Sequence, residues 1–145
     1  MAVQNELGYC MPVAEVCRLR DRYAPEALVH TDTVQALGKI DLPLHDWGVD
    51  LASFSAHKIG GPKGIGALYV KRGTKMFTTA FGGGQERGLR SGTEAVFLIV
   101  GFTEAMRLTY RSREADNEAM RDIWHYTVKR LREEIPSVII NSRED

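Results

Sequence analysis

Residues 51–58 read Leu-Ala-Ser-Phe-Ser-Ala-His-Lys. The first five are short and mostly apolar, which predicts a strand that is covered on both faces in a parallel sheet. Lys58 follows this strand at once and therefore stands at the mouth of a buried sheet. Desolvation and neighbouring cations favour a neutral amine at such a place, as a Schiff-base nucleophile requires. The alternative, which stays open on this residue alone, is a strand-end lysine that points into water.

Further elements are predicted on both sides of this segment. Residues 27–31 and 66–70 have the same strand character, and a helical connection separates residues 32 and 51. A helix is predicted over residues 12–23, because Pro12 suits the first helical turn and Pro25 disfavours helix before it. The alternation of strands with helices predicts an α/β fold, a mainly parallel sheet flanked by helices, with ligands beyond the carboxyl ends of its strands.

Two amphipathic helices are predicted between residues 94 and 135, because apolar residues recur there at helical spacing. Pro136 ends the second helix, and residues 138–140 are predicted to begin a strand. The two apolar stripes consist of Val96, Val100, Thr103, Met106 and Tyr110, and of Met120, Ile123, Trp124, Thr127, Val128, Leu131 and Ile135.

Composition limits the classes of function. The chain has 145 residues, about one domain, and 19 basic against 19 acidic side chains, which argues against nucleic acid or acidic lipid as partners. We find no signal peptide or membrane helix in the sequence. Cys10 and Cys17 match neither a zinc site nor a disulfide framework, so we expect a cytoplasmic protein with both cysteines as packing residues.

A carboxylate and an amide follow the first predicted strand. Asp32 ends that strand and Gln35 lies three residues later, on the same side if a helical turn begins there. Such a carboxylate can keep a pyridine nitrogen protonated, and such an amide can bond a phenolic oxygen. Alternatively, Asp32 only caps the turn that follows it.

Most of the glycines gather in two segments. Residues 60–66 lack the spacing of known nucleotide-binding loops, so they predict either a turn between strands or a backbone approach to an anion. Residues 82–93 combine glycines, a hydroxyl and two arginines before a predicted helix. This combination suits a phosphate site, and the alternative is a mobile surface loop.

Taken together and in this order, these segments resemble the cysteine desulfurase branch of the class V aminotransferase family. Its members are enzymes of fold type I that depend on pyridoxal 5'-phosphate (PLP), and selenocysteine lyases are close relatives. The likeness is continuous from about Val3 to Ala105. The matching stretches are Val3–Gly8, His30–Asp32, Gln35–Lys39, Gly48–Lys58, Gly61–Tyr69 and Gly82–Thr93.

The resemblance implies a role for seven residues. Lys58 would bond covalently to PLP, Asp32 would pair with the pyridine nitrogen and Gln35 would bond the phenolic oxygen. Asn5 would lie near that oxygen and the substrate carboxylate. Ser55 and His57 would bind the cofactor phosphate. In a homodimer, Thr93 would serve the phosphate of the partner's site.

The resemblance also implies an incomplete enzyme, because family members are two to three times longer. Residues 1–112 would be the central part of the PLP-binding large domain, and residues 113–145 would lead into a truncated small domain. Segments before Val3 and after Asp145 would supply a histidine that stacks on PLP, the persulfide-forming cysteine and an arginine for the substrate carboxylate. Neither Cys10 nor Cys17 matches that cysteine.

The intact enzyme would convert L-cysteine to L-alanine and pass the sulfur to its own cysteine and then to acceptor proteins, as in iron–sulfur cluster biogenesis. We expect the 145-residue chain alone to be inactive in this reaction. Three alternatives stay open: a selenocysteine lyase, a class V aminotransferase, and a noncatalytic truncated module that serves only association.

Overall fold

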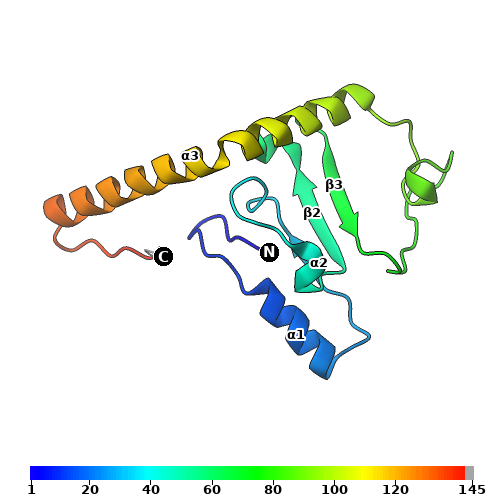
Figure 1. The fold of residues 1–145 in the computed structure, drawn as a ribbon, viewed down its shortest axis with the longest axis horizontal. Coiled ribbons are helices and arrows are strands. Elements are labelled where there is room, and N and C mark those ends of the chain that lie inside the picture. The colour runs from blue at the N-terminus through cyan, green and yellow to red at the C-terminus, as the bar shows by residue number, and fades with distance from the viewer. Residues whose placement is uncertain (143–145) are drawn as a thin grey trace.

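The computed structural model describes residues 1–142. Short strands form one small sheet, helices cover one side of it, and a long helix crosses its end (Figure 1). This arrangement confirms the α/β class. The elements in chain order are α1 (Val13–Tyr23), β1 (His30–Asp32), α2 (Leu44–Trp47), β2 (Leu51–Ser55), the 3-10 turn η1 (Ala56–Ile59), β3 (Gly66–Val70), the 3-10 turn η2 (Glu86–Gly88) and α3 (Val96–Glu134).

The sheet has the order β1-β2-β3. Strands β1 and β2 are parallel, as expected, and Asp32 pairs with Ser53. Strand β3 runs antiparallel to β2, which differs from a fully parallel arrangement. Residues 56–65 form only a turn and a short loop, whereas a parallel connection needs a crossover of a dozen or more residues.

Strand β1 begins at His30 instead of residue 27. The backbone before it is bonded to side chains: the Ala27 carbonyl accepts from Arg20, and the Val29 N–H donates to Asp50 at 2.9 Å. Arg20 also forms an ion pair with the buried Asp50. Burial alone would raise the pKa of Asp50, but the Val29 N–H and the Arg20 guanidinium more than offset it and hold that pKa below its usual value.

The main core lies between the sheet and helices α1 and α2 (Figure 1). Its buried residues are Ala2, Val13, Cys17, Ala36, Leu44, Val49 and Ala52. Cys17 is therefore a packing residue, as predicted. The same expectation is wrong for Cys10, which is exposed, because it lies in an isolated bridge with Val3 before the helix begins.

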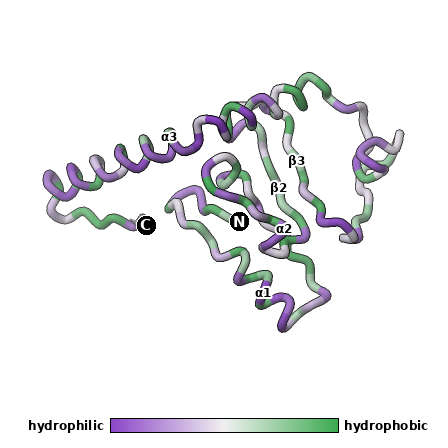
Figure 2. Tube along the Cα trace, viewed as in Figure 1, coloured by the Kyte–Doolittle hydropathy of each residue, from purple (hydrophilic) through white to green (hydrophobic). Residues whose placement is uncertain are grey.

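One helix of 39 residues stands where two were predicted. Its middle contains neither glycine nor proline, so nothing in the sequence breaks it. The predicted first stripe is also partly wrong, since Val96 and Val100 are exposed while Phe102 and Ala105 are buried. Figure 2 shows the hydrophobic first turns of α3 extending beyond the sheet. The proposed domain boundary at 112/113 lies within this helix and stays a prediction.

Residues 138–140 form no strand. The C-terminal segment turns back after α3 and runs alone toward the N-terminal segment, where the Tyr9 hydroxyl donates to the Asn141 carbonyl at 2.6 Å (Figure 1). The strand prediction fails because no described strand lies beside these residues to pair with them. Within residues 1–142, none of the helices combines the length and the apolar character that crossing a membrane requires.

Candidate functional site

The candidate site lies where β1 and β2 end side by side. Asp32 is the last residue of β1, and Ser55 is the last residue of β2. Because the two strands are parallel and Asp32 pairs with Ser53, both ends reach the same edge of the sheet. This edge, beyond the carboxyl ends of parallel strands, is the usual place for ligands in α/β folds.

Lys58 lies on η1, which continues directly from β2, and its side chain is exposed. Several contacts hold the backbone of this turn. The Ala56 N–H donates to Ile65 at 3.2 Å, and the Thr109 hydroxyl donates to the Ile59 carbonyl at 3.4 Å. Gly61 follows the turn, and a β-carbon there would lie 2.9 Å from the Ala56 carbonyl oxygen. Lys58 is thus an accessible amine on a tightly packed support.

Ser55 and His57 flank the start of the same turn. The Ser55 hydroxyl and Nδ1 of His57 are 2.8 Å apart, and the His57 side chain is exposed. A hydroxyl and an imidazole in contact offer adjacent hydrogen-bond donors to an anion. The structure therefore brings Ser55, His57 and Lys58 together at the end of β2.

Asp32 is exposed and is held from two sides. Its Oδ1 accepts from the Val34 N–H at 2.8 Å, and its carbonyl accepts from the Ala2 N–H at 2.7 Å. The capping alternative is thus realised, since this carboxylate does stabilise the turn that follows β1. Capping occupies one carboxylate oxygen, so the exposed group can also meet a ligand.

Gln35 lies in the turn after Asp32 and contacts a lysine that the sequence reasoning missed. Nζ of Lys39 donates to the Gln35 carbonyl at 3.1 Å and to Gln35 Oε1 at 3.4 Å. Burial lowers the pKa of Lys39, and the charge of Lys58 lowers it further, so the two lysines interact electrostatically. The signal that could have found Lys39 is its spacing of four residues from Gln35.

Within residues 1–142, Asn5 and Thr93 form no hydrogen bond with these groups. Asn5 is exposed in a turn that Gln4 holds by accepting from the Glu6 and Leu7 N–H groups, at 2.8 and 2.6 Å. The bond from Ala2 to Asp32 attaches this N-terminal segment to the site. Thr93 is exposed in the loop that carries η2, which lies on the far side of β3 from β1 (Figure 1). Within one chain, the structure does not bring Thr93 to Lys58.

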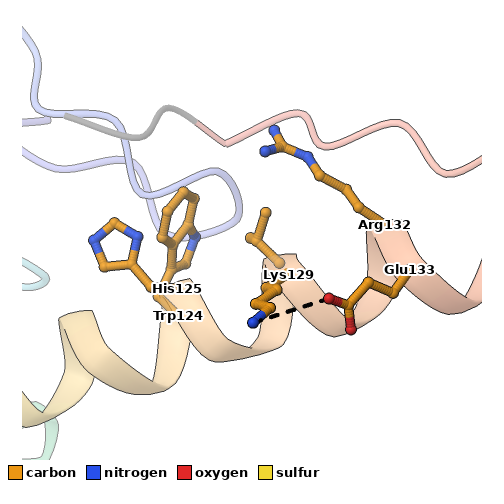
Figure 3. Close-up of a pocket in the computed structure, with 6 residues that line it drawn as sticks. Trp124, His125, Lys129, Arg132 and Glu133 are labelled. Atoms are coloured by element: carbon orange, nitrogen blue, oxygen red, sulfur yellow. Dashed lines mark ion pairs between the residues drawn. The ribbon is translucent and has the colours of Figure 1, made fainter.

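A cavity of about 330 Å³ lies elsewhere, along the second half of α3. Lys129 and Glu133 pair there at 4.0 Å, and Trp124 stands at the other end (Figure 3). Its lining residues are Trp124, His125, Val128, Lys129, Arg132 and Glu133. None of them is a predicted site residue, so the cavity is distinct from the edge that carries Asp32 and Lys58. Residues 1–142 contain no cluster of His, Cys, Asp or Glu suited to a metal ion.

Comparisons with known proteins cover the whole chain. The model of the family "Aminotransferase class-V" matches residues 1–145. A mitochondrial cysteine desulfurase of Arabidopsis thaliana is 42% identical in an alignment of 148 positions that covers 100% of this chain and 32% of that protein. The solved structure of a NifS-like protein has a TM-score of 0.92 at 40% identity, covering 99% of this chain and 39% of the other.

Another solved structure is SspA in complex with cysteine, with a TM-score of 0.68 at 40% identity over 73% of this chain and 30% of that one. The chain thus spans about a third of the length of the curated relatives it matches, between 31% and 36%. The match by family model, sequence and fold agrees with the resemblance that the motifs indicate. The chain belongs to the class V aminotransferase family, in its cysteine desulfurase branch.

Proposed function

We propose that this chain is the central PLP-binding part of a cysteine desulfurase-like enzyme. The observation that carries the proposal is the placement of an accessible amine, Lys58, and an accessible carboxylate, Asp32, at the same edge of the sheet. The chain spans about a third of its relatives, so the activity is proposed for a protein of their length and not for this segment alone.

The residues present at this edge fit PLP. Asp32 would face the pyridine nitrogen, Gln35 the phenolic oxygen, and Ser55 with His57 the phosphate, while Lys58 would hold the cofactor covalently. The donor set supports this assignment, because an amide, a hydroxyl in contact with an imidazole, and an amine follow the ends of β1 and β2 at the edge of the sheet that carries the Asp32 carboxylate. PLP, when bound, supplies an electron sink for carbanion chemistry at the substrate.

This chain's own side chains would then orient the reactants and move protons. Lys58 would accept and return the proton at the substrate's α-carbon, which its exposed position on a packed turn allows. The carboxylate of Asp32 would keep the pyridine nitrogen protonated. Asn5 would lie beside the phenolic oxygen and the substrate carboxylate, and the bond from Ala2 to Asp32 supports this placement.

The proposed substrate is L-cysteine, which would yield L-alanine and a persulfide on an enzyme cysteine. The names of the relatives and the cysteine complex of SspA support this choice. Cys17 is unsuited to accept the sulfur, because it is 1% exposed and burial raises the pKa of its thiol. Cys10 is exposed but, like Cys17, does not match the persulfide-forming cysteine of the family, so we expect no alanine from L-cysteine when the 145-residue chain is assayed alone.

We also propose that the site is completed in a homodimer. Thr93 is exposed on a loop that lies away from Lys58 of the same chain, so it is available to the site of a second copy. If so, a Thr93→Ala variant should bind PLP more weakly in the dimer and equally in any monomeric fraction separated by size exclusion.

The test of cofactor binding uses the chain as it stands. On addition of PLP, we expect a visible absorption band in wild type and in Lys63→Ala, and none in Lys58→Ala. Lys63 is the matched control because it is an exposed lysine on the loop that follows η1. Reduction with borohydride followed by peptide mapping should place a phosphopyridoxyl group on Lys58. Labelling of Lys63 or Lys39 in preference to Lys58 would contradict the proposal.

A further inference from the structure

Lys39 and Gln35 form a contact that none of the motifs explains, and the intervening Gly38 lies against Ile59 of η1. Residues 33–40 wind as consecutive helical turns, in which the Leu37 N–H donates to Thr33 at 2.9 Å and the Ile40 N–H to Ala36 at 3.1 Å. This winding places residues 35 and 39 on one side. Nζ of Lys39 then lies between two oxygens of Gln35, the carbonyl at 3.1 Å and Oε1 at 3.4 Å.

The chemistry of the two groups fixes which end of the amide faces Lys39. An ammonium group has three donors and no acceptor, whereas a glutamine amide has an accepting oxygen and a donating NH2. If the amide turned around, its NH2 would face the ammonium, and donor would oppose donor. Lys39 therefore keeps Oε1 toward itself and leaves the NH2 of Gln35 pointing away, free to donate to a ligand oxygen.

The surroundings keep Lys39 in this place. Its side chain is half-buried, and its carbonyl accepts from the Asn117 side chain of α3 at 2.7 Å. The adjacent Gly38 is buried against Thr109 of the same helix. The backbone that carries Lys39 is thus fixed independently of its ammonium group, so a change of the side chain leaves these anchors intact.

We propose that Lys39 is a positioning residue that orients the amide of Gln35, so that its NH2 donates to an oxygen of the bound ligand that can only accept. This inference rests on the proposed function for the identity of the ligand, since the phenolate oxygen of PLP is such an acceptor. The orientation of the Gln35 amide is a property of the chain without ligand. It can therefore be measured whether or not PLP binds.

The first experiment observes the amide directly in the full chain without ligand. The sequence contains three glutamines, Gln4, Gln35 and Gln85, so labelling of glutamine side chains with nitrogen-15 gives three NH2 signals. We expect the heteronuclear NOE of the Gln35 signal to fall in Lys39→Met and to be retained in Lys39→Arg. The signals of Gln4 and Gln85 serve as internal controls. An unchanged NOE of Gln35 in Lys39→Met would overturn the proposal.

The second experiment measures the Kd of PLP in a double-mutant cycle. Loss of one oriented hydrogen bond is worth about 1 kcal/mol, so Lys39→Met should weaken binding roughly fivefold. In a Gln35→Leu background the same change should have an effect of less than about twofold, because the partner is absent. Lys63→Met, which removes an exposed lysine, is the charge-matched control.

An equal loss in both backgrounds would show that Lys39 acts through its charge on Lys58 or by direct contact with PLP, and would overturn the positioning role. Absence of PLP binding in wild type would refute the proposed function instead. In that case the NOE of Gln35 still decides whether Lys39 orients the amide. The two failures are therefore distinguishable.

Discussion

Substitution of Gly38 by alanine should weaken the contact between α3 and the turn that carries Gln35. Gly38 has φ of 73°, and a β-carbon at this position would lie 2.3 Å from Cγ2 of Thr109. The left-handed backbone costs a non-glycine residue about 1–2 kcal/mol, partly offset by about 0.4–1 kcal/mol from the stiffer unfolded chain. The contact is more than 1 Å too short for two carbons, and such overpacking costs about 1–3 kcal/mol.

The expected loss for Gly38→Ala is therefore about 3 kcal/mol in the free energy of unfolding. For a chain of this length, that corresponds to a decrease in Tm of roughly 6–12 °C. Urea titration followed by circular dichroism measures the free energy, and a thermal scan measures the Tm. Gly64→Ala is the matched control, because Gly64 has φ of 87° with no atom within 4 Å of its β-carbon. This control should lose only about 1 kcal/mol.

A second variant background separates the cost of the left-handed backbone at residue 38 from the cost of the steric clash with Thr109. Thr109→Ser removes Cγ2 and keeps the hydroxyl that donates to Ile59. In this background, Gly38→Ala should cost about 1 kcal/mol, as in the Gly64 control, because only the backbone strain remains. If Gly38→Ala costs the same in both backgrounds, or no more than Gly64→Ala, then α3 does not pack on this turn as described.

Three further predictions address the core and the ionisable groups. The pKa of Asp50 is lower in the folded chain than in the unfolded chain, where it is about 4, so the ionised carboxylate stabilises the fold above about pH 4. This stabilisation is lost as the pH falls through the pKa of the folded state. The free energy of unfolding of Asp50→Asn should therefore depend less on pH in this range than that of wild type. Phe102→Ala should lower the free energy of unfolding by about 3–5 kcal/mol, since this ring is 6% exposed, whereas Phe97→Ala at 76% exposure should change it by less than about 0.5 kcal/mol. In native chain treated with a thiol reagent, Cys10 should react fast and Cys17 only on unfolding; equal rates would contradict the burial of Cys17.

Much of the sheet and its edge could be predicted from local sequence. The apolar run Leu51–Ser55 and the polar residues that follow it, up to Lys58, describe a strand and its end within eight positions. The strand Gly66–Val70 was equally clear, although its direction was not. The direction of a strand depends on the length of the connection from the preceding strand. The sequence pattern within the strand does not contain that length.

The remaining features depend on partners that lie far away in the chain. The late start of β1 results from the Asp50 carboxylate, which takes the Val29 N–H, and the sequence does not show that these residues meet. The buried side of α3 is set by η1, which selects Phe102 and Ala105 over the equally apolar Val96. Lys39 could not be predicted as a site residue, because its role depends on its contact with Gln35 and follows only once Gln35 is assigned to the site.

The unbroken length of α3 has a mechanical consequence. At a rise of about 1.5 Å per residue, the part of the helix from Asn117, whose side chain donates to the Lys39 carbonyl, to Glu134 is about 26 Å long. A tilt of about 5° about the Asn117 end would displace the far end by about 2 Å. Conversely, a force applied near Glu134 would act through this lever arm on the Asn117 bond and so on the turn that carries Lys39.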